Sequence, residues 1–135
     1  MLFWKKVKNP EKVRHELKVL WVHDHAPYLT YVDEVNVGQR EVYFEGPHVK
    51  GNVEVGDELL VLDCNGEKLA RVQVTEWETR NQGTLLGSVN TGRYLQMSGT
   101  LVSGDKFDVE RASMIVNADL DLNQADKEVE ESVEA

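Results

Sequence analysis

The densest set of metal-capable groups in the sequence is His23-Asp24-His25. On an extended strand the two imidazoles would face one side, and His15 or His48 could supply a third ligand. A zinc site needs three or four ligands, and the sequence offers no residue that would orient these imidazoles. We therefore expect a surface junction without a metal ion, and we keep a small metal-dependent regulator or enzyme using His23 and His25 as the alternative.

Cys64 is the only cysteine, so the chain can form neither an internal disulfide bond nor a four-cysteine zinc site. It follows Asp63, and a neighbouring carboxylate disfavours the thiolate that a nucleophile needs. The sequence has no Gly-x-Ser-x-Gly motif, and its carboxylates are scattered over turns. We predict that the protein is not an enzyme and that it uses no cofactor.

Aromatic residues that lie near cations in the sequence could form a stacking platform for single-stranded nucleic acid. Positions three apart on a strand face opposite sides, which argues against this role for Arg40 with Tyr43 and for Trp77 with Arg80. We expect these aromatic residues to lie in a core, and residues 78–83 to form an exposed contact loop. The cations remain as candidate partner contacts: Arg40, His48, Lys50, Arg71, Arg80 and Arg93.

The chain has 135 residues, enough for one domain with an ordinary core. Its 15 Lys and Arg against 24 Asp and Glu give a net charge of -9. Residues 1–20 have a balance of +4, with six basic and two acidic residues, whereas residues 117–135 have a balance of -6, with seven acidic residues and one lysine. Free duplex nucleic acid is a poor partner for so acidic a chain, so we expect a protein or ribonucleoprotein partner.

The start of the chain carries its charge after a short apolar patch, unlike a secretory signal, and no segment approaches the ~20 apolar residues of a membrane span. We expect a cytoplasmic protein. Asn9 suits an N-cap, Pro10 suits the first helical turn, and apolar residues recur at helical spacing, which predicts a helix from Pro10 to Val22. The alternative is an extended segment from Glu16 to His23, and oligomerisation through this basic amphipathic end is a further hypothesis.

From Pro27 to Val116 short β-type runs alternate with Gly, Asn and Asp, as in an all-β sandwich or barrel. Asn65-Gly66 predicts a tight hairpin turn, and Gly56-Asp57 and Gly104-Asp105 each predict a turn that leads into a strand. The expected strands are Tyr28–Val35, Arg40–Glu45, Glu58–Asp63, Lys68–Trp77, Thr84–Val89, Tyr94–Met97 and Lys106–Glu110.

Residues 117–135 contain few large apolar groups and no aromatic residue. They predict a flexible, solvated acidic tail. A short docking helix through Leu120, Leu122 and Val129 is the alternative. The expected organisation is therefore a basic amphipathic segment at 1–26, a β-domain at 27–116 and an acidic tail at 117–135.

The order of the β-region resembles the second domain of elongation factor Tu and related translational GTPases. The stretches that carry the resemblance are Pro27–Val35, Glu41–Gly46 and Val49–Leu59, with Lys68–Trp77 continuing it. Residues 92–105 match the closing strand of that domain loosely, so the resemblance spans about residues 27–110. It implies a small closed Greek-key β-barrel.

In that family the barrel is an accessory module that packs on a GTPase domain and contacts tRNA ends or ribosomal RNA. This chain has no Gly-x-x-x-x-Gly-Lys-Ser/Thr sequence, so GTP binding is not expected. Residues 37–41 replace the Arg-Gly-Thr stretch of the family, which weakens a transfer of its RNA contacts. The resemblance implies a non-enzymatic binding module for a protein or ribonucleoprotein partner.

Overall fold

The computed structural model describes residues 9–81 and 93–134, and its first element is helix α2 (Pro10–His25). Asn9 caps this helix, because its Oδ1 accepts the Glu11 N–H at 3.0 Å. The helix ends at His25, and its C-cap Ala26 is extended because it precedes Pro27, and a residue before proline avoids helical geometry. The predicted helix is confirmed and is three residues longer than expected, whereas the extended alternative is wrong.

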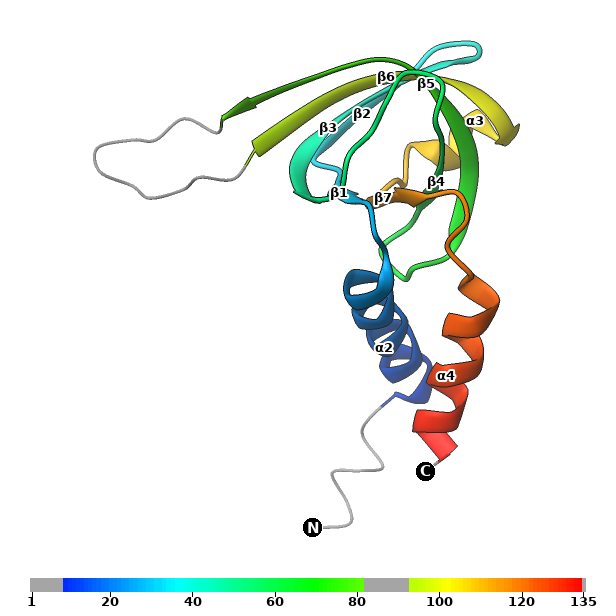
Figure 1. The fold of residues 1–135 in the computed structure, drawn as a ribbon. Helices are drawn as coiled ribbons and strands as arrows, with labels where there is room; N and C mark the ends of the chain where they lie inside the picture. The colour runs from blue at the N-terminus through cyan, green and yellow to red at the C-terminus, as the bar shows by residue number, and fades with distance from the viewer. Residues whose placement is uncertain (1–8, 82–92, 135) are drawn as a thin grey trace, which may run out of the picture.

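Six antiparallel strands of the described chain close into a barrel, and a seventh is added at one side (Figure 1). The order around the barrel is β1-β7-β4-β5-β6-β3, and β3 pairs back onto β1. Strand β2 pairs with β3 alone among the described strands. The prediction of an all-β barrel is confirmed. The strands are β1 (Leu29–Tyr31), β2 (Glu34–Val37), β3 (Glu41–Lys50), β4 (Glu58–Leu62), β5 (Lys68–Asn81), β6 (Arg93–Gly104) and β7 (Met114–Asn117).

The described residues form two apolar clusters, one inside the barrel and one between the barrel and the helices. Phe44, Val72 and Met97 lie in the first, and Val22 of α2 packs with Leu62 of β4 in the second. Strand β4 is therefore buried along most of its length, because its inner face meets the barrel core and its outer face meets α2. This explains its continuous apolar run, Leu-Leu-Val-Leu.

Most predicted strands are confirmed, with different ends. The run Tyr28–Val35 forms two strands, β1 and the start of β2, and Lys68–Trp77 continues to Asn81 in β5. Part of the expected contact loop 78–83 is therefore strand. The predicted strand Thr84–Val89 lies outside the described residues, and β7 was not expected.

The predicted strand Lys106–Glu110 is wrong, because this segment forms the one-turn helix α3 (Lys106–Val109). Gly104 adopts a φ of +100°, and Asp105 then caps the turn, with Oδ1 accepting the Phe107 N–H at 2.8 Å. An N-cap of this kind starts a helix, while the alternating residues alone suggest a strand. The turn at Gly104-Asp105 is confirmed, and the element after it differs.

The predicted hairpin at Asn65-Gly66 joins β4 to β5 and is confirmed, although its turn differs from the expected one. The Asp63 C=O accepts the Gly66 N–H at 3.0 Å, so Cys64 and Asn65 are the central residues of the turn. Gly66 follows with a φ of +80°, in the left-handed region. Cys64, Asn65 and Gly66 therefore form a three-residue hairpin loop that ends in a left-handed residue.

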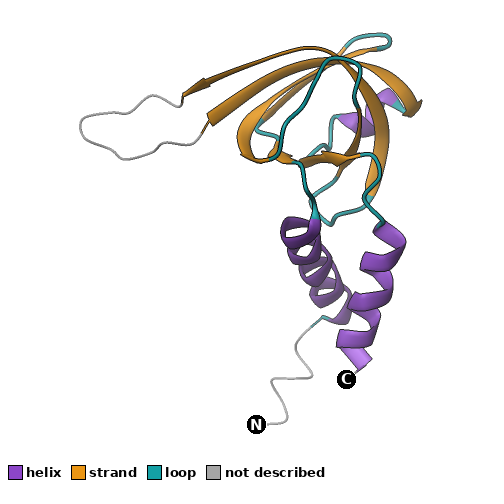
Figure 2. Ribbon diagram, in the orientation of Figure 1, coloured by secondary structure: helices purple, strands orange, loops and turns teal. Residues whose placement is uncertain are grey.

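The acidic segment at the end of the chain forms helix α4 (Leu122–Glu134), so the prediction of a flexible solvated tail is wrong. Figures 1 and 2 show α4 beside α2, on the same end of the barrel. Ala125 and Val129 are buried, and Leu122 packs against the cluster under the barrel. The docking-helix alternative therefore describes the segment, because these residues recur at helical spacing on one face.

An ion pair and a hydrogen bond also hold the two helices together. Arg14 of α2 forms an ion pair with Glu130 of α4 at 3.0 Å, and the Trp21 Nε1–H donates to Glu128 at 3.0 Å. The pKa of Glu130 is lowered by its hydrogen bond to Arg14. Neither helix has the length and hydropathy that crossing a membrane requires, within the described part of the chain.

Candidate functional site

The outer face of strands β2, β3, β6 and β5 carries a row of acidic side chains. Strand register aligns Glu34 with Glu45, Glu45 with Gln96, and Gln96 with Glu78. Alternate residues of the same strands, such as Phe44 and Met97, fill the barrel core, so the row points outward. Three carboxylates thus lie on one line across four strands.

A second row runs beside the first on the same face. Register aligns Asn36 with Tyr43, Tyr43 with Ser98, and Ser98 with Glu76. The surface is hollowed along this row by one depression of about 560 Å³ and one of about 260 Å³. Tyr43, Glu76 and Ser98 line both hollows. We define the acidic face by the two rows: Glu34, Glu45, Gln96, Glu78, Asn36, Tyr43, Ser98 and Glu76.

Two like charges lie directly opposite each other on this face. Glu34 and Glu45 form a cross-strand pair, and the pKa of Glu34 is raised, first by its hydrogen bond with Glu45 and then by the charge of Glu45. Opposed like charges destabilise a strand pair. The fold therefore places two carboxylates side by side on this face.

Tyrosines border these carboxylates. The pKa of Tyr43 is raised, mainly by burial and then by the charge of Glu45. The pKa of Tyr94 is raised by burial and by Asp33, whose Oδ2 accepts a hydrogen bond from the Tyr94 hydroxyl at 3.4 Å. The face thus combines negative charge with neutral aromatic rings, which is a surface suited to cationic and aliphatic parts of lysine and arginine.

The outer-face carboxylates are positioned by neighbouring groups. The Gln96 amide donates to the Glu45 carboxylate at Oε1, at 3.1 Å, while the Asp33 N–H donates to the backbone carbonyl of Glu45 at 2.7 Å and fixes the strand that carries it. Neither contact brings a nucleophile next to a general base. The arrangement offers hydrogen-bond acceptors and negative charge, which is chemistry for binding.

The basic residues singled out from the sequence are not gathered into one site. Arg71 forms an ion pair with Glu58 at 3.0 Å, and the Lys50 ammonium donates to the carbonyl oxygen of His23. Arg40 is exposed in the turn before β3, at the far end of that strand from His48. Register pairs Arg93 of β6 with His48 of β3, and Arg80 of β5 pairs with Tyr94, the neighbour of Arg93 on β6.

His48 belongs to a polar chain at the seam where β1 meets β3. Its Nδ1 lies 2.9 Å from Thr30 Oγ1, and its Nε2 lies 2.7 Å from the Gly51 carbonyl oxygen, to which Nε2–H must donate. Thr30 also bonds the Tyr28 hydroxyl at 2.8 Å. Both imidazole nitrogens are thus engaged within the fold.

This seam gives a pH prediction for Tyr28. Burial raises the pKa of Tyr28 to about 12. Between pH ~10 and ~12 the unfolded chain loses this proton and the folded one keeps it, so the free energy of unfolding should fall by about 2–3 kcal/mol as pH rises. Absorbance of phenolate should show a late titration step that Tyr28→Phe removes. A Tyr28→Phe variant that retains that step would contradict the assignment.

The two histidines of the metal alternative diverge. They are two residues apart on helix α2, and such residues do not share a helix face. The His25 ring stacks on Trp21 with centroids 4.2 Å apart, whereas the His23 ring lies near Tyr31. The described residues include no group of three or more His, Cys, Asp or Glu side chains that could hold a metal ion. The expected extended geometry is therefore wrong.

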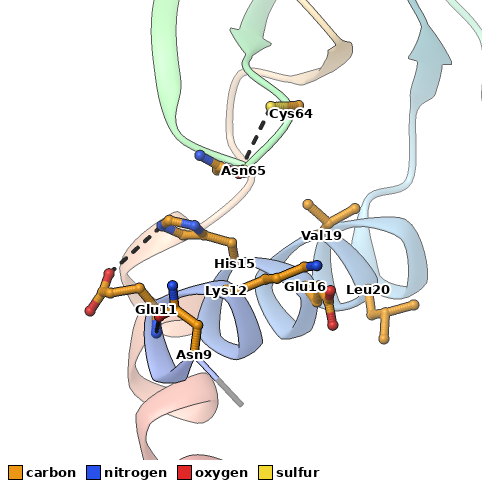
Figure 3. A pocket seen from close by; sticks show the side chains of 9 residues that line it. All are labelled: Asn9, Glu11, Lys12, His15, Glu16, Val19, Leu20, Cys64 and Asn65. Carbon is orange, nitrogen blue, oxygen red and sulfur yellow. Dashed lines mark hydrogen bonds and ion pairs between the residues drawn. The ribbon is translucent and has the colours of Figure 1, made fainter. Parts of the chain in front are cut away.

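A larger hollow of about 630 Å³ lies between α2 and the β4–β5 turn (Figure 3). Cys64 and His15 both line this hollow. If their side chains were in contact, they would suggest a nucleophile and its base. His15 instead lies 3.9 Å from Glu11, and Cys64 Sγ lies 3.8 Å from Asn65 Oδ1. Figure 3 shows these two contacts on opposite walls of the hollow. They do not form a catalytic pair.

Neither the protein-family models nor the curated proteins compared with this chain match it.

The acidic face was not predicted from the sequence. Alternation in Glu41-Val42-Tyr43-Phe44-Glu45 and in Glu76-Trp77-Glu78 does show that each strand has an acidic outer side. Only the order β2-β3-β6-β5 brings these sides together, and β3 and β6 are far apart in the sequence. The sequence therefore showed the acidic side of each single strand, but it did not show which strands are neighbours in the sheet.

Proposed function

We propose that this chain is a non-enzymatic binding module of the translation-factor β-barrel type, and that its acidic face binds a lysine- and arginine-rich segment of a protein partner. The observation that carries the proposal is the cross-strand pair of Glu34 and Glu45 beside hollows lined by Tyr43 and Glu76. Carboxylates gathered on one face attract a cationic segment through complementary charge.

The strand order supports the barrel type. Strands β4, β5 and β6 follow one another as a meander, and β3 lies beside β6 while its connection runs to β4 on the other side. This spatial order, β3-β6-β5-β4, has the form of a Greek key. It agrees with the closed Greek-key barrel that the resemblance to the second domain of elongation factor Tu implies.

The charge distribution favours a basic protein segment over RNA. Phosphate groups need exposed lysine or arginine, and Arg71 and Lys50 are engaged in contacts within the chain. The acidic face presents carboxylates from three of its four strands, β2, β3 and β5, and these repel phosphate. A ribonucleoprotein would therefore be engaged through its protein component.

The proposal predicts that charge removal on the acidic face weakens binding. We expect Glu34→Gln with Glu78→Gln to weaken binding of a fluorescent peptide of alternating lysine and threonine by roughly two- to fivefold per carboxylate removed. Fluorescence anisotropy at fixed ionic strength measures this. The same variant should unfold at a higher urea concentration than wild type, because the Glu34–Glu45 repulsion is relieved.

The matched control changes net charge equally on another surface. Glu110→Gln with Glu131→Gln removes two exposed carboxylates, one after α3 and one on α4. If this control weakens peptide binding as much as the acidic-face variant, binding follows net charge and the proposal fails. Binding of single-stranded oligouridine in preference to the peptide would instead assign the chain to RNA.

A further inference from the structure

The two hollows of the acidic face follow one another along the strands. The smaller one, of about 260 Å³, takes its walls from the first and the second row of that face. The residues of these rows that line it are Gln96, Glu78, Tyr43, Ser98 and Glu76. It therefore lies over β3, β6 and β5, between the two rows.

The larger hollow, of about 560 Å³, is displaced by one row. It shares Tyr43, Ser98 and Glu76 with the smaller hollow, and its other lining residues include Glu41 and Thr100. Glu41 of β3 and Thr100 of β6 are cross-strand partners, and each lies two residues along its strand from a member of the second row. They form a third row on the same face, because residues two apart on a strand point to the same side.

The offset between the hollows matches the repeat of an extended chain. A strand rises about 3.4 Å per residue, so successive rows lie roughly 7 Å apart along the strands, and the hollows are offset by the same distance. Side chains on one side of an extended peptide recur at every second residue, which is the same interval. A peptide that runs along β3 and β6 would therefore place alternate side chains in successive hollows.

Each hollow is bordered by two exposed carboxylates. Glu78 and Glu76 border the smaller one, whereas Glu76 and Glu41 border the larger one. None of the ion pairs among the described residues uses these three carboxylates. Tyr43 lines both hollows, and a tyrosine ring packs well against the aliphatic stem and the charge of a lysine or arginine. Both hollows therefore suit a cationic side chain.

We propose that the two hollows are paired subsites, which bind two lysine or arginine side chains that lie two residues apart in an extended segment of the partner protein. This inference rests on the proposed function and names the sequence pattern that the acidic face selects. The segment lies over the outer face of the sheet and is held by its side chains. A helical segment would instead bring together cations three or four residues apart, so the spacing of the cations distinguishes the two shapes.

Charge argues against a second copy of this chain as the occupant. Each molecule has a net charge of -9, so two copies repel one another as they approach. The same charge attracts a separate cationic segment.

Peptides of identical composition test the spacing directly. Two threonine-rich fluorescent peptides carry two lysines each, at positions i and i+2 in one and at i and i+3 in the other. Their net charge is equal, but only the first places both lysines on one side of an extended chain. We expect wild type to bind the i, i+2 peptide about two- to fivefold more tightly by fluorescence anisotropy, which is the contribution of one exposed ion pair.

Single variants assign this preference to the two hollows. Glu78→Gln acts on the smaller hollow and Glu41→Gln on the larger one, because each residue lines only that one of the two. Either variant should bring the affinities of the two peptides to within about twofold of each other, since one lysine loses its partner. Glu110→Gln removes an exposed carboxylate from another surface and is the matched control, which should keep the preference of wild type.

Equal binding of the two peptides by wild type would overturn the paired subsites. If Glu34→Gln with Glu78→Gln still weakened the alternating lysine–threonine peptide more than its own control did, the proposed function would stand without them. Tighter binding of the i, i+3 peptide would identify a helical ligand and also overturn the inference. Self-association of the protein that either peptide reverses would identify a second copy as the occupant, with the same consequence.

Discussion

Replacing Gly46 with alanine is expected to destabilise the protein by about 3 kcal/mol or more, at the upper end of overpacking effects. A Cβ at this position would lie 1.7 Å from the Tyr31 carbonyl oxygen and 2.6 Å from its carbonyl carbon. Both atoms belong to backbone, so a side-chain rotation cannot relieve the clash. Strand β3 would have to separate from β1, which opens the barrel at its closing seam.

The segment after Tyr31 cannot easily move away. The Val32 N–H donates to the Ser113 carbonyl at 3.0 Å, and the Asp33 N–H donates to the Glu45 carbonyl at 2.7 Å. These bonds fix the chain between β1 and β2. Displacing it would also shift Glu34, so Gly46→Ala should weaken peptide binding as well as lower stability.

Urea denaturation of Gly46→Ala beside Gly38→Ala measures the effect. A Cβ on Gly38 would have its nearest contact at 3.4 Å, from the Glu41 carbonyl oxygen, which is ordinary packing. We expect Gly38→Ala to stay within about 0.5 kcal/mol of wild type, as most surface substitutions do. Equal stability of the two variants would show that β1 and β3 are not in contact at Gly46.

Local sequence patterns predicted most of the elements and few of their partners. Asn9 and Pro10 identified the start of α2, and the Asn65-Gly66 pair identified the β4–β5 hairpin. These features depend on residues within a few positions of one another. The acidic face depends on pairing between β3 and β6, whose partners Glu45 and Gln96 are separated by 51 positions.

The acidic end shows why composition alone misled. Residues 117–135 are strongly charged and lack aromatic residues, which is typical of a solvated segment. The basic balance of residues 1–20 was visible too, and the two ends are complementary. Reading them separately concealed that α4 packs against α2, through pairs such as Arg14 with Glu130.

Removing both carboxylates from the buried Lys18 is expected to cost about 3 kcal/mol of stability. The Lys18 ammonium lies 2.9 Å from Asp126 of α4 and 3.2 Å from Glu67 after the β4–β5 turn, and the residue is 4% exposed. A double variant, Glu67→Gln with Asp126→Asn, leaves this charge buried without a counter-ion. Helix α4 should then detach first, since it loses one of its polar contacts with α2 and faces an unpaired buried ammonium.

Lys18→Met tests whether the cost arises from the buried charge. Methionine keeps much of the apolar stem and removes the ammonium, and a buried ion pair replaced by apolar groups is often neutral in stability. Adding Lys18→Met to the double variant should therefore recover most of the lost stability in urea denaturation, and it should restore resistance of α4 to limited proteolysis. If Lys18→Met recovered nothing, the carboxylates would act through contacts other than Lys18. Recovery would establish that the basic and acidic ends of the chain are joined at this residue, which links the barrel, through the β4–β5 turn, to both helices.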